Sequence, residues 1–166
     1  MKKVMCYSRF RFVQKMRMLN WTDATLPKTV AVISICCTEP VAKNFVSSGY
    51  CGVEDVHYFA DAENVLNIDF DDIFTATKDC GYYVATCITN EQALEIVKFI
   101  EAHKDCDFYL HCNAGKSRSQ AVVRYIIDAY SDEYEIELNP NFPCEYPNEF
   151  VLDALRRAGK LIGKQL

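Results

Sequence analysis

Residues 29–37 form a nearly continuous apolar run that is rich in β-branched side chains. Such a run is typical of a strand buried on both faces, as in a parallel sheet. Residues 65–70 (Val-Leu-Asn-Ile-Asp-Phe) and 107–111 (Asp-Phe-Tyr-Leu-His) predict two further strands. The pattern therefore favours a parallel sheet at the centre of the fold.

Helical periodicity appears between these apolar runs. The clearest predicted helix spans residues 90–104, where apolar residues recur at helical spacing behind a capping box formed by Thr89 and Gln92. Three further helices are expected: after residue 118, over 148–160 and, with a basic outer face, over 8–19.

Alternating strands and helices predict an α/β fold, with a mostly parallel central sheet flanked by helices. Ligands of such folds bind beyond the carboxyl ends of the strands. We therefore expect the functional site to be built from residues 36–40, 71–80 and 112–118. The chain shows no internal repeat or linker, and its 166 residues fit a single domain over 1–166.

Charge and composition exclude several partners. The 18 Lys+Arg against 23 Asp+Glu give a net charge of −5, which disfavours a nucleic-acid partner. No apolar run approaches the ~18–20 residues that span a membrane. Arg9 and Arg11 interrupt the N-terminal apolar stretch before a signal-peptide core is complete. We expect a cytoplasmic protein without a membrane partner.

The nine cysteines include no C-x-x-C pair, so a disulfide framework and a zinc site both lack their usual signature. His57 and His103 have no partners at metal-ligand spacing in the sequence, and we expect them to be structural or surface residues and the protein to hold no metal. In a reducing cytoplasm, the reactivity of a particular cysteine matters more than the number of cysteines.

One segment combines a cysteine with a loop suited to anions. Residues 111–119 are His-Cys-Asn-Ala-Gly-Lys-Ser-Arg-Ser, between a predicted strand and a predicted helix, and five residues separate Cys112 from Arg118. A loop of this length lets backbone N–H groups converge on one point, reinforced by the N-terminus of the following helix. Gly115 permits the backbone angles of such a curl. The expected phosphate-binding residues are Asn113, Ala114, Gly115, Lys116, Ser117 and Arg118.

Each residue around this loop has an expected role. A phosphate fits with the Cys112 sulfur below its phosphorus and the Arg118 guanidinium on two of its oxygens. The same donors favour the thiolate, so Cys112 is the expected nucleophile. Ser119 can donate to the sulfur and stabilise it as a leaving group. Because neighbouring residues of a strand point to opposite faces, His111 should face away from the sulfur and brace the loop by hydrogen bonding.

The string His111-Cys112-x-Ala114-Gly115-x-Ser117-Arg118-Ser119 resembles the signature of the cysteine-dependent protein phosphatases, in their compact dual-specificity branch. Residues 30–36, 70–73 and 138–141 more weakly resemble segments of bacterial and phage members. The resemblance implies a phosphate loop between a strand and a helix, and a two-step reaction through a Cys112 phosphoenzyme. It implies no cofactor and no metal, with a phosphorylated protein as substrate.

The resemblance also implies a general acid on an upstream loop. Aligning Ile68 to Asp72 with the family pattern selects Asp72, with Asp71 second. The interval to Cys112 is longer than in compact eukaryotic members, and Gly81-Tyr82-Tyr83 lie in the excess. The two tyrosines either pack ordinarily or line the pocket. Lys116 replaces the usual apolar residue and adds charge at the pocket mouth, as in phosphoinositide-acting relatives.

Other functions remain open on the sequence. A non-catalytic phosphate-binding module would keep the loop without a working acid, and a phosphoinositide or an RNA 5′ phosphate is an alternative substrate. Arsenate reduction and sulfur transfer use related loops with different strings. A nucleotide P-loop needs a glycine where Leu110 stands. Cys36 and Cys37, rather than Cys106, are candidate redox partners of Cys112, because six extended residues hold Cys106 about 20 Å away.

Overall fold

A computed structural model describes residues 1–47, 57–59, 62–130, 133–137 and 146–164. The sequence segment 138–141 compared above with phosphatases lies outside the described residues. The elements are β1 (Lys2–Ser8), α1 (Arg9–Met18), β2 (Val30–Cys36), α2 (Glu39–Ser47), β3 (Val65–Asp69), β4 (Thr77–Asp79), β5 (Val84–Thr86), α3 (Asn90–Ala102), β6 (Asp107–Cys112), α4 (Arg118–Ala129), β7 (Tyr134–Glu137) and α5 (Glu149–Leu161).

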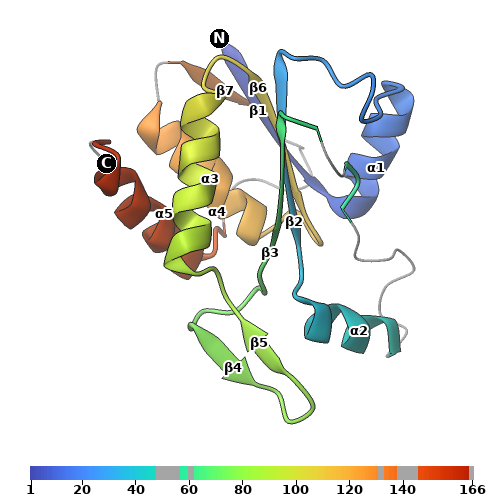
Figure 1. Cartoon of the computed structure of the whole chain (residues 1–166), viewed down its shortest axis with the longest axis vertical. Helices are drawn as coiled ribbons and strands as arrows, with labels where there is room; N and C mark the ends of the chain where they lie inside the picture. Colours follow the sequence, from blue (N-terminus) through green and yellow to red (C-terminus); the bar gives the residue numbers. More distant parts are fainter. Residues whose placement is uncertain (48–56, 60–61, 131–132, 138–145, 165–166) are drawn as a thin grey trace.

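Five strands form the central sheet in the order β3-β2-β6-β1-β7, and every neighbouring pair in it runs parallel. Strand β2 is buried along its whole length, as its uninterrupted apolar run predicts. Helices α3, α4 and α5 cover one face of the sheet and α1 covers the other (Figure 1). The predicted α/β fold with a parallel central sheet is confirmed.

Helix α3 begins with the predicted capping box. The Thr89 hydroxyl accepts a hydrogen bond from the Gln92 amide, and the Gln92 side chain accepts one from the Thr89 amide. The face of α3 that carries Ile96, Val97 and Ile100 is buried in the main core between the sheet and the helices α3, α4 and α5. A second, smaller core packs α1 against the opposite face of the sheet.

Four features of the fold were not predicted: strands β1 and β7, helix α2 and the β4–β5 hairpin. Strand β1 lies inside the sheet, between β6 and β7, although it carries two lysines. All three residues of β4 are exposed, so no hydrophobic pattern marks this strand. The hairpin uses part of the extra length between Asp72 and Cys112.

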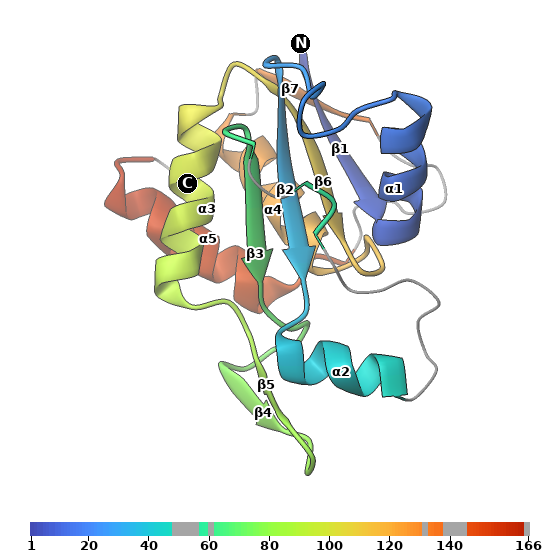
Figure 2. The same cartoon turned by 45° about the vertical axis from the view of Figure 1, so that its right-hand side comes forward.

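The carboxyl ends of the sheet strands point to one edge, where α2 and the β4–β5 hairpin lie beyond the strands (Figure 2). This edge brings together parts of the three segments that the sequence assigned to the functional site. No helix among the described residues has the length and apolar character needed to cross a membrane.

Candidate active site

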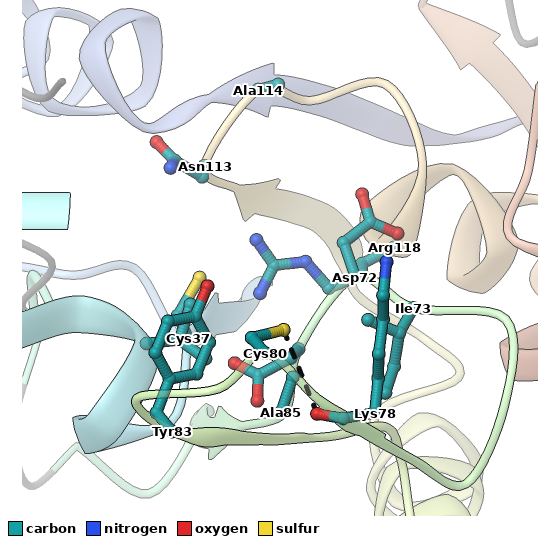
Figure 3. A pocket seen from close by; sticks show the side chains of 12 residues that line it. Cys37, Asp72, Ile73, Lys78, Cys80, Tyr83, Ala85, Asn113, Ala114 and Arg118 are labelled. Carbon is teal, nitrogen blue, oxygen red and sulfur yellow. Dashed lines mark hydrogen bonds between the residues drawn. The ribbon is translucent and has the colours of Figure 1, made fainter. Parts of the chain in front are cut away.

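A cavity of about 300 Å³ opens at this edge of the sheet. Figure 3 shows it between the 113–114 loop, the β4–β5 hairpin and the residues that follow β2 and β3. Its lining residues are Cys37, Val41, Asp71, Asp72, Ile73, Lys78, Cys80, Tyr83, Ala85, Asn113, Ala114 and Arg118. Residues predicted from three separate parts of the sequence thus line one cavity.

Cys112 is the last residue of β6, and the two residues that follow it in the chain line this cavity. Its sulfur accepts a hydrogen bond from the Gly115 amide, with a nitrogen–sulfur distance of 3.2 Å, and one from the Ser119 hydroxyl at 3.0 Å. The cysteine is 1% exposed, and its neighbours Asn113 and Ala114 line the cavity in its place. The donors predicted from the loop and from the helix start therefore both reach the sulfur.

Gly115 has a steric reason to be glycine. Its φ of +70° lies in the left-handed region, and a Cβ there would come within 2.5 Å of the Ser8 nitrogen and the Tyr7 carbonyl carbon. The loop therefore packs directly on the end of β1. The Arg9 amide, which follows β1, also holds the loop by donating a hydrogen bond to the Asn113 carbonyl. This contact with the unpredicted strand β1 fixes the path of the loop.

Arg118 is the first residue of α4, and its guanidinium points into the cavity (Figure 3). The Nη1 atom donates to the carbonyls of Cys36 and Phe70, at 3.1 and 2.7 Å. The Nε atom is buried and makes no hydrogen bond to the described residues. Burial lowers the pKa of Arg118, but the sulfurs of Cys112 and Cys37 and the Asp72 carboxylate raise it, with a net rise. The positively charged guanidinium of Arg118 is thus held at the ends of β2 and β3.

The two aspartates after β3 differ in their surroundings. Asp71 is buried, and its carboxylate accepts hydrogen bonds from the amide and hydroxyl of Thr38 and from the Thr86 amide. It therefore joins the hairpin to the end of β2. Asp72 is exposed, with Oδ1 accepting from the Ser117 hydroxyl at 2.6 Å, while Oδ2 makes no hydrogen bond to a described residue. Of the two, Asp72 has an oxygen available for proton transfer.

Asn148 is a site residue that the sequence analysis missed. It is fully buried, and its amide donates to Asp72 Oδ1 at 2.9 Å and to the Ile73 carbonyl at 3.1 Å. It also caps α5 by accepting from the Val151 amide. An Asn before a helix indicates an N-cap, but its partner Asp72 is 76 residues away in the chain, which no local pattern reveals.

The expected role of His111 is corrected. Its ring faces away from Cys112 as predicted, but neither ring nitrogen makes a hydrogen bond to a described residue. The ring instead packs against Phe12 of α1, with ring centroids 4.4 Å apart. Burial first, and then the nearby Arg9 and His57, lower its pKa to about 3. His111 therefore supports the loop by packing as a neutral ring, because strand alternation directs it into the aromatic core under α1.

Lys116 differs from expectation, and the two tyrosines differ from each other. Lys116 is exposed and does not line the cavity, whereas Lys78 of the hairpin does. Tyr82 is 98% exposed and packs against little, and Tyr83 lines the cavity. The positive charge and the aromatic ring at the mouth thus come from the hairpin, which the sequence analysis did not detect.

The cysteines are distributed over both faces of the sheet, and no two of the seven that the structure describes are joined by a disulfide. Cys37 lines the cavity, but the Cys36 sulfur lies on the α1 face, against Arg9 and His57, so Cys36 is not placed to bridge Cys112. Cys6 of β1 lies closer: its thiol donates to the Ser119 hydroxyl at 3.1 Å, and that hydroxyl donates to Cys112.

His57 has partners that the sequence did not indicate. Cys36, His57 and Asp69 bring one potential metal-ligating atom each to within 4.8 Å of one another. Sequence spacing did not reveal these partners, because pairing of the adjacent strands β2 and β3 brings Cys36 and Asp69 together from positions that are far apart in the chain.

Comparisons of the chain with known protein families, with curated proteins and with solved structures found no match in any of the three.

Proposed function

We propose that this protein is a cysteine-dependent phosphatase that hydrolyses phosphate monoesters of proteins, phosphotyrosine first and phosphoserine or phosphothreonine second. One observation carries the proposal. The Cys112 sulfur accepts hydrogen bonds from the Gly115 amide and the Ser119 hydroxyl, and the buried Arg118 guanidinium lies at the same loop. A thiolate surrounded by such donors is suited to attack a phosphate that the same loop binds.

In the first step, the Cys112 sulfur attacks phosphorus and the bond to the leaving oxygen breaks. Arg118 is fixed through Nη1, so its remaining N–H groups can grip two phosphate oxygens as charge develops on them. Asp72 protonates the leaving oxygen from its unbonded Oδ2. Because Cys112 is nearly enclosed, we expect the loop residues that line the cavity to move aside for the phosphate before the attack, while Gly115 keeps its contact with β1.

In the second step, water attacks the phosphocysteine and the S–P bond breaks. Asp72, now a carboxylate, accepts a proton from the water. The Ser119 hydroxyl, 3.0 Å from the sulfur, donates to it as negative charge returns. Asn148 and Ser117 hold Asp72 through Oδ1, which keeps the acid at the cavity in both steps.

The cavity walls favour an aryl phosphate. Val41, Ile73, Tyr83 and Ala85 supply apolar surface around the polar floor, and the cavity of about 300 Å³ has room for a phenyl ring with its phosphate. We propose a phosphorylated protein as the partner and a reducing compartment, the cytoplasm, as the location, because the proposed nucleophile acts as a free thiolate.

Hydrolysis of an aryl phosphate in the presence of a chelator tests the proposal. Wild-type protein should turn over and form a phosphocysteine that quenched-reaction peptide mapping locates at Cys112. Cys112→Ser should lose at least about 10³-fold in kcat. Cys106→Ser is the matched control, because Cys106 is also buried but lies at the opposite, amino end of β6.

Equal turnover by wild type and Cys112→Ser would contradict the assignment of the nucleophile. No turnover by pure wild-type protein that still binds inorganic phosphate would instead support the non-catalytic binding module. A panel of phosphopeptides, phosphoinositides and RNA 5′ phosphates then ranks the substrate classes.

A further inference from the structure

A second polar cluster lies on the α1 face of the sheet, at the ends of β2 and β3. Cys36 is its centre: its Sγ lies 3.3 Å from His57 Nδ1 and accepts a hydrogen bond of 2.9 Å from Arg9 Nη2. His57 Nε2 lies 2.8 Å from Asp69 Oδ1. The Ser34 hydroxyl shares His57 Nδ1 at 2.8 Å. Side chains of helix α1 and of the segment before β3 thus meet at a sulfur carried by β2.

The order of contacts is that of an activated nucleophile. A thiol within hydrogen-bond reach of an imidazole, whose other nitrogen faces a carboxylate, can pass its proton to the ring. The carboxylate of Asp69 then faces the imidazolium, and the guanidinium of Arg9 faces the thiolate. Each charge formed by the transfer thus has an oppositely charged group within hydrogen-bond reach.

A second observation comes from His111, which is 1% exposed and makes no ring hydrogen bond to a described residue. His111 pairs in register with Ser34, whose hydroxyl contacts His57. The neutral ring of His111 leaves this corner without a further positive charge. Of the two imidazoles in this corner, that of His57 is the one in contact with the sulfur.

The same three ligand types can hold a metal ion, but the contacts favour a reactive thiolate. The guanidinium of Arg9, buried and 2.9 Å from the sulfur, would repel a cation bound there. Cys36 is 2% exposed, so only a small reagent can reach the sulfur, while the His57 side chain is 25% exposed and opens the cluster to solvent. A small, neutral oxidant fits these limits.

We infer that Cys36 is a second reactive thiolate of the protein, separate from Cys112, and a site of oxidation by hydrogen peroxide. Its sulfur attacks one peroxide oxygen, so an S–O bond forms and the O–O bond breaks. The departing hydroxide takes the proton held by His57 and leaves as water. The sulfur loses two electrons, the peroxide gains them, and the product is a sulfenic acid at Cys36.

Oxidation at Cys36 should reach the phosphate loop, a step that rests on the proposed function. The Cys36 carbonyl accepts the 3.1 Å hydrogen bond from Arg118 Nη1, and the next residue, Cys37, lines the cavity. An added oxygen would disturb the contacts of the sulfur with Arg9 and His57, at 2.9 and 3.3 Å, and we expect the end of β2 to shift in response. Arg118 then loses one of the two carbonyls that position its guanidinium.

The experiment uses full-length Cys112→Ser, which removes the proposed nucleophile. The protein is treated with limiting hydrogen peroxide, the peroxide is removed with catalase, and the chain is then unfolded in the presence of a cyclic 1,3-diketone that traps sulfenic acids and a reagent that blocks free thiols. Trapped peptides are quantified by mass spectrometry. Cys36 should be trapped at least about tenfold faster than Cys106, whose thiol pKa is raised by burial. Equal rates would overturn the proposal.

Two added substitutions test the role of the cluster. His57→Gln should slow trapping at Cys36 about tenfold, and Asp69→Asn, which changes an exposed carboxylate and keeps the fold testable, about threefold. His103→Gln is the matched control, because within the described residues the His103 ring contacts Phe99 of its own helix and not the Cys36 cluster, and this substitution should leave the rate unchanged. A rate at Cys36 that is equal in all of these variants would overturn the role of His57. One equivalent of zinc in protein purified without chelator, lost in His57→Gln, would overturn the thiolate in favour of a metal site.

The coupling to Arg118 is measured with tungstate, a phosphate analogue. Peroxide should weaken tungstate binding to Cys112→Ser about tenfold and leave Cys36→Ser/Cys112→Ser unchanged. Full trapping at Cys36 with unchanged tungstate affinity would overturn the coupling alone. Untreated protein that binds no tungstate would count against the proposed function and, with it, the coupling, while the trapping rates still decide the reactive thiolate.

Discussion

Two thiols lie at the carboxyl edge of the sheet, on opposite faces and almost equally buried: Cys112 is 1% exposed and Cys36 2% exposed. Cys112 faces the core under α4 and receives hydrogen bonds from the Gly115 amide and the Ser119 hydroxyl. Cys36 faces α1 and contacts a guanidinium and an imidazole. Burial therefore does not distinguish the two sulfurs, and their partners do.

The partners suit different chemistry. Around Cys112 the donors come from a loop and a helix start, which fix positive potential in space without a group that takes up a proton. Around Cys36 an imidazole with a carboxylate behind it can take the proton of the thiol. Each sulfur has one buried arginine nearby, Arg118 and Arg9. Paired substitutions, one on each face of the sheet, should therefore affect phosphate hydrolysis and peroxide oxidation separately.

The carboxylates should separate the faces most strongly. Asp72→Asn should lower kcat by about 10²–10⁴ for a phosphate ester with a basic leaving group, and less for one with an acidic leaving group, because protonation matters most for a basic oxyanion. Asp69→Asn, on the α1 face, should change turnover less than about twofold. The leaving-group dependence of kcat measures this, and its appearance in Asp71→Asn instead would move the acid by one residue.

The arginines form the next pair. Arg118→Lys should lower kcat/KM for an aryl phosphate by about 10²–10³, because a lysine keeps the charge but loses the planar set of donors. Arg9→Lys should change kcat/KM less than about fivefold while slowing peroxide trapping at Cys36. Steady-state kinetics on both variants test this, and a similar loss in the two would show that the faces are not independent.

The sequence predicted most of the residues around Cys112 and none of the contacts around Cys36. Cys112, Arg118 and Ser119 are close in sequence, so a strand, a loop and a helix start place them around one sulfur by local geometry alone. The apolar run of β2 and the capping box of α3 predicted the sheet and its βα order in the same local way. These features depend on neighbours within a few residues.

The Cys36 face depends on contacts that no local pattern records. Cys36 and His57 are 21 residues apart, and Asp69 joins them because β2 and β3 pair in register. Strand β1 was missed because its lysines hide the buried pair Val4 and Met5, and the hairpin because its exposed residues carry no periodicity. Sequence reasoning thus predicted the residues that one loop groups around Cys112, and it missed the cluster that strand pairing assembles around Cys36.

Two glycines with positive φ test how β1 holds the 113–117 loop. Gly115→Ala should lower the free energy of unfolding by about 2–4 kcal/mol, because its Cβ would meet the backbone of Tyr7 and Ser8 at 2.5 Å in addition to the strain at φ +70°. Gly81→Ala, at φ +84° with nothing within 4 Å, should cost only about 1 kcal/mol. Denaturant unfolding of both variants gives the difference, and equal losses would mean that the close contact with β1 is unimportant.

The smallest effect is a pH dependence from the α1 face. Burial lowers the pKa of His111 to about 3 from its ordinary 6.5, so between these values the unfolded chain binds a proton that the folded chain does not. Its contribution to stability is complete above pH 6.5 and is lost as the pH falls, by about 2 kcal/mol at pH 5. His111→Gln should remove this part of the slope, and His103→Gln, a second histidine-to-glutamine change, should retain it. Unfolding free energies of the three proteins at pH 7.5 and 5 measure the difference. An unchanged slope in His111→Gln would mean that the ring takes up a proton in the folded state, and the neutral corner beside Cys36 would then be positively charged.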